Sequence, residues 1–156
     1  MMRLLGGLLA GLSATLLMER ASSFLYERQT DGTREREEAL RPEMPTTVLV
    51  RKAAAVVVGD LEERQASRLG AATHYAFGAA GGPLAAFLTG RGASPVGAGL
   101  TVAAAMELGA DQGMNTVLGL TAPTWAFPLV TQVRGLVAHL VYGLALGLLL
   151  AAGGKR

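Results

Sequence analysis

The chain has 156 residues and a net charge of +2, and 51% of its residues are apolar whereas only 17% are charged. The length corresponds to one domain, and the absence of cysteine excludes disulfides, a thiolate nucleophile and cysteine-bound zinc. Most charged residues lie between Glu19 and Arg68, where acids and bases are interleaved, so the sequence does not predict nucleic-acid binding. The remaining stretches carry few charges, which is typical of a protein that crosses a membrane.

Four apolar segments follow one another along the chain, at about residues 2–18, 70–88, 96–108 and 129–152. A helix needs ~20 residues to cross a bilayer, so we expect the first segment to continue to about Tyr26. The third segment either ends at Leu108 or continues to Leu120, and we favour the longer helix. Alanine, leucine and glycine dominate without strict alternation, so each segment predicts a helix. The predicted fold is an all-α integral membrane four-helix bundle.

The connectors between these segments differ in length. The first one, residues 20–69, is long and charged, and its part at 46–58 predicts an amphipathic helix that lies at the membrane interface or packs over the bundle. Asp60, with Glu63 three residues later, predicts a helix cap before the second segment. The next connector is short, and Pro95 predicts the start of the third helix.

One pattern, G-x3-H-x2-[FY]-G-x3-G, occurs in both the second and the fourth segment. The first copy comprises Gly70, His74, Phe77, Gly78 and Gly82, and the second comprises Gly135, His139, Tyr142, Gly143 and Gly147. The first and third segments also align without a gap. The first has a Gly-Leu-Ser triplet at 11–13 and a Met-Glu pair that ends in Glu19, and the third has a Gly-Leu-Thr triplet at 99–101 and a Met-Glu pair that ends in Glu107. We interpret the chain as a tandem duplication of a helical hairpin.

The duplication defines the expected domain organisation. Residues 1–156 form a single membrane domain, with unit one at 1–89, including the connector 20–69, and unit two at 95–152. Each unit crosses the membrane twice, so the units have the same orientation and form a parallel repeat about an axis along the membrane normal.

The repeated ionisable residues are the candidate site. In each hairpin the glutamate lies near the end of the first helix and the histidine near the start of the second, so both lie on the same side of the membrane. If the two hairpins pack about a pseudo-two-fold axis, four side chains come together, namely Glu19, His74, Glu107 and His139. Such a set binds a divalent metal or passes protons. The alternative is that each glutamate pairs with its own histidine or a nearby arginine and only fixes the hairpin. In a continued third helix, Asp111 lies one turn beyond Glu107 and either enlarges the site or faces interfacial water; if the helix ends at Leu108, Asp111 is a loop residue.

The small residues of the pattern predict close helix packing. Gly78 with Gly82, and Gly143 with Gly147, form two GxxxG faces. We favour packing inside the bundle, and the alternative is assembly of a homo-oligomer through these faces.

The segment from Asp111 to Pro123 (DQGMNTVLGLTAP) and the run RGLVAHLVYG from Arg134 resemble the YagU-like family of small bacterial inner-membrane proteins of unknown function. The resemblance implies a multi-pass protein of the bacterial inner membrane and assigns no catalytic residue. We favour the cytoplasmic side for both termini.

The expected function is not enzymatic, because no nucleophile motif, phosphate-binding glycine loop or cofactor fingerprint is present. The favoured role is movement or sensing of an ion or proton through the Glu/His cluster. The alternatives are a scaffold protein that assembles through its glycine faces and a membrane-embedded metal-dependent enzyme. The expected partner is the lipid bilayer, with a second copy of the chain if the glycine faces assemble a homo-oligomer. No cofactor is expected, unless the Glu/His cluster binds a divalent metal.

Overall fold

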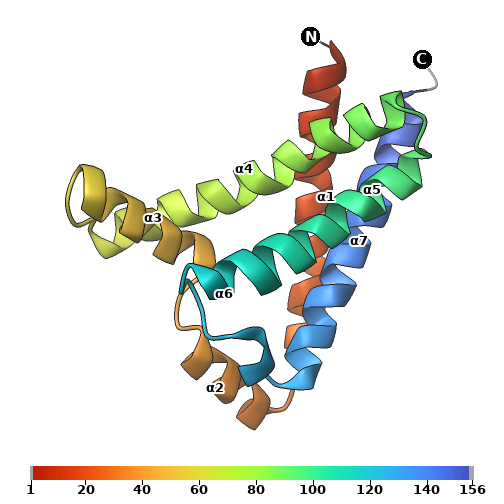
Figure 1. Ribbon diagram of the computed structural model, residues 1–156. Helices are drawn as coiled ribbons and strands as arrows, with labels where there is room; N and C mark the ends of the chain where they lie inside the picture. Colours follow the sequence, from red (N-terminus) through yellow and green to blue (C-terminus); the bar gives the residue numbers. More distant parts are fainter. Residues whose placement is uncertain (1, 155–156) are drawn as a thin grey trace.

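The computed structural model describes residues 2–154, which form helices and connecting turns without any strand. Figure 1 shows α1 (Met2–Tyr26) and α7 (Leu129–Gly153) side by side, with α4 (Glu63–Gly90) and α5 (Pro95–Ala104) crossing them on a diagonal. The start of α1 and the end of α7 lie at the same end of the molecule. The expected all-α fold is confirmed.

Two helices are long and apolar enough to cross a membrane, namely α1 from Leu4 to Tyr26 and α7 from Leu129 to Gly153. Within residues 2–154, α4 and α5 do not meet the same criterion. The apolar part of α4 is rich in glycine and alanine, which contribute less hydropathy than leucine, and its first turns carry charges. The four-span membrane bundle therefore stays a prediction.

The third apolar segment continues beyond Leu108, but it does not stay an α-helix. After α5 the chain forms the π-helix η1 (Ala105–Met114) and then the short helix α6 (Asn115–Val117). Two glycines, Gly109 and Gly113, lie within η1 and lower its preference for the α-helical form.

Local sequence signals predict the start of α5 correctly and the start of α4 incorrectly. Pro95 begins α5 as predicted, and the Ser94 hydroxyl caps this helix by accepting a hydrogen bond from the Gly97 N–H at 3.1 Å. The predicted cap at Asp60 is wrong, because α4 has Glu62 at its N-cap and no side-chain cap bond. Asp60 follows Gly59, whose φ of +94° turns the chain between the helices, so Asp60 stays in the linker.

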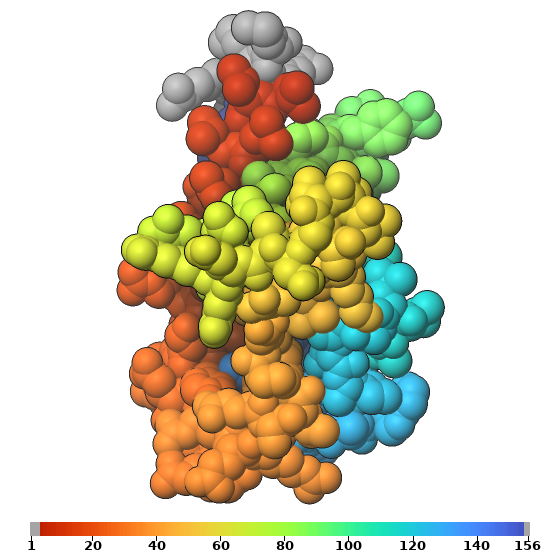
Figure 2. Space-filling view, turned by 90° about the vertical axis from the view of Figure 1, so that its left-hand side faces the viewer, coloured from red at the N-terminus to blue at the C-terminus, as the bar shows by residue number. Residues whose placement is uncertain are grey.

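The long connector folds into α2 (Asp31–Leu40) and α3 (Pro45–Val57), and Figure 2 shows its residues, in orange and yellow, covering one face of the molecule. Helix α3 packs against α4, where Thr47 lies over Gly70. Lys52 donates hydrogen bonds to the carbonyls of Leu118 and Gly119, at 2.7 and 3.1 Å. These bonds tie α3 to the turn after α6, before the 3-10 turn η2 (Thr124–Ala126) leads into α7.

Both hairpins cross at glycines of the repeat. The backbone of Gly11 meets that of Gly78 in the first hairpin, and the backbone of Gly99 meets that of Gly143 in the second. A Cβ atom on Gly99 would lie 2.2 Å from the Gly143 carbonyl oxygen, so only glycine fits there. The core between the hairpins is formed by Ala10, Ala14, Ala85, Ala98, Val102, Ala103, Tyr142 and Leu146.

Candidate functional site

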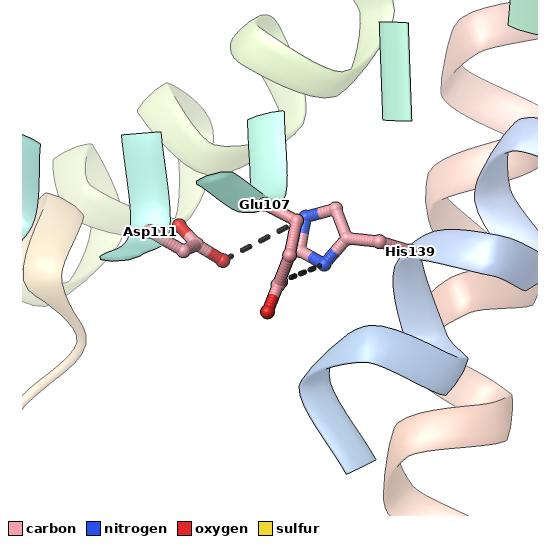
Figure 3. A group of neighbouring side chains, drawn as sticks. All are labelled: Glu107, Asp111 and His139. Atoms are coloured by element: carbon pink, nitrogen blue, oxygen red, sulfur yellow. Dashed lines mark ion pairs between the residues drawn. The ribbon is translucent and has the colours of Figure 1, made fainter. Parts of the chain in front are cut away.

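The second hairpin holds a cluster of two carboxylates and one imidazole. Glu107 Oε2 on η1 lies 2.7 Å from Nδ1 of His139 on α7, and Asp111 Oδ2 lies 3.6 Å from Nε2 of the same ring. Figure 3 shows each of the two ring nitrogens joined by an ion pair to a different carboxylate. Each residue offers a ligand atom within 4.8 Å of the other two, which is close enough for one cation to contact all three.

The cluster runs from the interior to the surface. The side chain of Glu107 is 6% exposed and that of His139 is 12% exposed, whereas that of Asp111 is 54% exposed. A buried carboxylate needs hydrogen-bond donors, and Glu107 also accepts one from Gln112 Nε2 at 2.9 Å. The cluster thus has one open end, at Asp111.

The π-helical form of η1 explains why these side chains meet. A π-helix bonds residue i to residue i+5, so position 112 lies one turn after position 107. Gln112 can therefore reach Glu107, while Asp111 stays on the same side of the helix. Across the interface, a Cβ on Gly135 of α7 would lie 3.5 Å from Glu107 Oε1, an ordinary van der Waals distance, so the carboxylate packs directly against this position of α7.

The hydrogen bonds of His139 assign its two ring nitrogens. Nδ1 lies beside two acceptors, Glu107 Oε2 and the Gly135 carbonyl at 3.1 Å, so the neutral ring carries its proton on Nδ1. Nε2 then presents a lone pair toward Asp111. A histidine that binds a metal commonly has this arrangement, with its other ring N–H donated to a carboxylate or a carbonyl. His139 and Asp111 can therefore ligate an ion that Glu107 orients or also binds.

An apolar groove of about 290 Å³ opens beside the buried end of the cluster. Its lining consists of Leu100, Ala103, Ala104, Glu107, Leu108, Leu136, His139 and Leu140. Because aliphatic side chains form most of its walls, the groove places an apolar environment on one side of the Glu107–His139 contact. Such an environment strengthens the electrostatic contact within the pair.

The first hairpin holds a simpler pair. Glu19 Oε1 lies 3.3 Å from His74 Nε2, and the Tyr75 hydroxyl donates to Glu19 Oε2 at 2.7 Å. The side chains of Glu19 and His74 are 36% and 28% exposed. Ser23, four residues after Glu19, occupies the place that Asp111 holds after Glu107. The first hairpin thus has no third carboxylate at this position.

The four residues of the predicted site therefore meet as two pairs, each within its own hairpin. Within residues 2–154, the only group of three or more histidine, aspartate or glutamate side chains close enough to share an ion is Glu107, Asp111 and His139. Asp111 joins the second pair, as the longer third helix predicted. Tyr75 was not predicted as part of the site, although it is a polar residue in an apolar segment, directly after His74.

The four glycines of the predicted packing faces contact other helices of the same chain. Gly78 and Gly82 lie against Thr15 and Gly7 of α1, and Gly143 and Gly147 lie against α5 and the residues at its start. A Cβ on Gly82 would lie 1.8 Å from the Gly7 carbonyl oxygen. These faces are thus occupied within the chain, and an assembly surface has to use other residues.

Comparison with known proteins adds no family assignment. No family model matches the chain, and neither the curated proteins nor the solved structures contain a match.

Proposed function

We propose that this chain is a small multi-pass membrane protein that binds a divalent cation at Glu107, Asp111 and His139 and moves or senses it. The observation that carries the proposal is the approach of three ligand atoms to within 4.8 Å of one another on two neighbouring helices. A structural Glu–His pair explains the contact of Glu107 with His139, but it does not require a second carboxylate beside Nε2.

The membrane part of the proposal is supported by α1 and α7 and by the surface they expose. Leu9 on α1 is 65% exposed and Leu148 on α7 is 61% exposed, and further exposed leucines follow along both helices. An apolar surface of this extent is typical of contact with lipid. In the proposed arrangement α4 and the segment from α5 to α6 complete four spans, and the resemblance to the YagU-like family favours the bacterial inner membrane.

The donor set suggests the class of cation. One imidazole nitrogen and two carboxylates suit zinc, manganese or iron in the divalent state, whereas a calcium site would be built from oxygen ligands alone. The graded exposure, from Asp111 to Glu107, gives an ion a route into the cluster from its open end. We propose binding and movement or sensing of the ion as the role of this cluster.

A calorimetric titration of the purified protein in detergent with Zn²⁺ and Mn²⁺ tests this function. We expect one ion per chain for the unchanged protein, and at least about a tenfold loss of affinity in H139A and D111N, because each removes a direct ligand. H74A is the matched control, since it makes the same change at the equivalent position of the first hairpin, and it should bind normally. Equal losses in H74A and H139A, or no binding by the unchanged protein, would contradict the proposal.

A second candidate, proton movement, is favoured by the continuous contact from Asp111 through His139 to Glu107. Such a chain lets the imidazole accept a proton on one nitrogen and release one from the other. Proteoliposomes that contain a pH-sensitive dye measure this flux. Proton movement predicts a proton flux that occurs without any added metal and that is lost in H139A. Retained flux in H139A would exclude this route.

A further inference from the structure

A second cavity, of about 520 Å³, lies apart from the cation cluster, where α1 ends, α2 passes and α7 begins. Figure 1 shows α2 at this end of the molecule. The cavity is lined by Ser22, Ser23, Tyr26, Glu27, Glu37, Glu38, Arg41 and Arg134. Its size falls within the range of small-molecule sites, and its walls are formed mainly by polar and charged side chains.

One wall of the cavity carries an excess of positive charge. Arg41 and Arg134 both contact Oε1 of Glu37, Arg41 at 2.5 Å, and the Thr131 hydroxyl donates to Glu37 Oε2 at 2.9 Å. Glu37 is only 3% exposed, and it is the single carboxylate between two guanidinium groups. One positive charge therefore remains after this pairing.

The more accessible donors of this wall belong to Arg41. Its side chain is 35% exposed, whereas that of Arg134 is 10% exposed. A guanidinium whose N–H groups reach an open cavity is suited to bind a phosphate oxygen.

The cavity also has two further acidic side chains in its lining. Glu38 accepts a hydrogen bond from the Tyr26 hydroxyl at 2.5 Å, and Glu27 forms no ion pair among residues 2–154. A simple anion in the cavity would meet two carboxylates, and a simple cation would meet two guanidinium groups. The charges match a ligand that carries both an anionic and a cationic group.

The position of the cavity indicates the source of such a ligand. The cavity is lined by Tyr26, where the candidate membrane span of α1 ends, and by Arg134, in the second turn of the candidate span of α7. The end of a span is the depth at which lipid headgroups lie. We propose that the cavity binds the headgroup of a zwitterionic phospholipid with a primary ammonium, phosphatidylethanolamine, with its phosphate at Arg134 and Arg41 and its ammonium at Glu27 and Glu38.

The three common headgroups should bind differently. Phosphatidylglycerol lacks a cationic group and leaves both carboxylates unpaired. Phosphatidylcholine has a quaternary ammonium that cannot donate hydrogen bonds to Glu27 or Glu38. The proposal rests on the membrane placement proposed above but not on the cation site.

Native mass spectrometry of the full chain in detergent, with equal amounts of the three lipids, tests the proposal. We expect phosphatidylethanolamine to be retained roughly threefold to tenfold over each of the others, because two partly exposed charge contacts separate them. The double variant E27Q/E38Q should lose this preference and retain phosphatidylglycerol as well. The control variant E62Q/E63Q removes the same two charges on the exposed start of α4 and should behave as the unchanged protein.

Three outcomes would overturn the proposal. They are equal retention of the three lipids by the unchanged protein, the same preference in E27Q/E38Q as in its control, and displacement of all lipids alike by inorganic phosphate. Two further measurements separate this proposal from the function proposed above. D111N should lose the cation but keep the lipid preference, and alkaline extraction of membranes tests independently whether the chain is integral to the bilayer.

Discussion

The two hairpins share a helix crossing and differ in the site beside it. In both, repeat glycines bring the helices together and a glutamate of one helix contacts a histidine of the other. The first pair, Glu19 and His74, is about one-third exposed and 3.3 Å apart, whereas the second, Glu107 and His139, is nearly buried and 2.7 Å apart. The shared sequence pattern thus accounts for the pair, and residues outside the pattern account for its environment.

Two local features separate the hairpins. The second has the π-helix η1, which places Asp111 and Gln112 next to its Glu–His pair, whereas the first continues as regular α-helix past Glu19 and has Ser23 at the matching position. A duplicated pair can therefore serve packing in one hairpin and bind a ligand in the other. The following predictions test this difference.

The largest effect on the free energy of unfolding is expected at the glycine crossings, which the two hairpins share. G82A brings a Cβ to 1.8 Å from the Gly7 carbonyl, and G147A brings one to 2.6 Å from Val96 Cα. Because backbone lies in the way, each should lower the free energy of unfolding by about 1–3 kcal/mol or more, measured by unfolding in mixed detergent micelles. G6A is the control, since nothing lies within 4 Å of its Cβ, and it should be neutral or stabilising. A destabilising effect in only one hairpin would mean that the two crossings are not equivalent.

Removal of the glutamate side chain should lower the free energy of unfolding by different amounts in the two Glu–His pairs. E107A removes the partner of a buried imidazole and of Gln112, and it should cost about 1–3 kcal/mol of unfolding free energy. E19A breaks a partly exposed pair and should cost less than about 1 kcal/mol. The same unfolding assay measures both variants. Equal costs would show that burial does not distinguish the pairs.

Cation binding at the second pair should depend on pH. A metal-bound imidazole has to be unprotonated at the ligating nitrogen, so binding competes with protons. The affinity for Zn²⁺ should fall as the pH is lowered through the range in which imidazoles titrate, and H74A should show the same pH profile as the unchanged protein. An affinity that does not change with pH would exclude His139 as a ligand.

The smallest effect is expected from transferring the third carboxylate. S23D places an aspartate four residues after Glu19, as Asp111 follows Glu107, and should create a second, weaker cation site beside His74. The site should be weaker because η1 has no counterpart in the first hairpin. Titration of S23D/H139A isolates the new site, with H139A as the control. No gain in binding over H139A would mean that the carboxylate alone does not distinguish the hairpins.

The helices and the glutamate and histidine that meet in each hairpin are easier to predict from the sequence than the backbone form of η1 and the contacts between distant segments. Apolar runs predict helices directly, and the matched positions of His74 and His139 identify which residues meet, because in each hairpin the glutamate ends one apolar segment and the histidine lies near the start of the next. The π-helical form of η1 was not predicted, since Gly109 and Gly113 are compatible with several backbone forms. The contact of Glu37 with Arg134 was not predicted either, because it joins residues 97 positions apart and depends on where α2 packs.

The central claim is that one hairpin, and not both together, forms the cation site. X-ray absorption at the zinc edge of the Zn²⁺-loaded protein counts the imidazoles bound to each ion. The account predicts one imidazole per zinc, from His139, together with carboxylate oxygens, and the same spectrum in H74A. Two imidazoles per zinc, reduced to one in H74A, would show that His74 and His139 share one ion and would contradict the account.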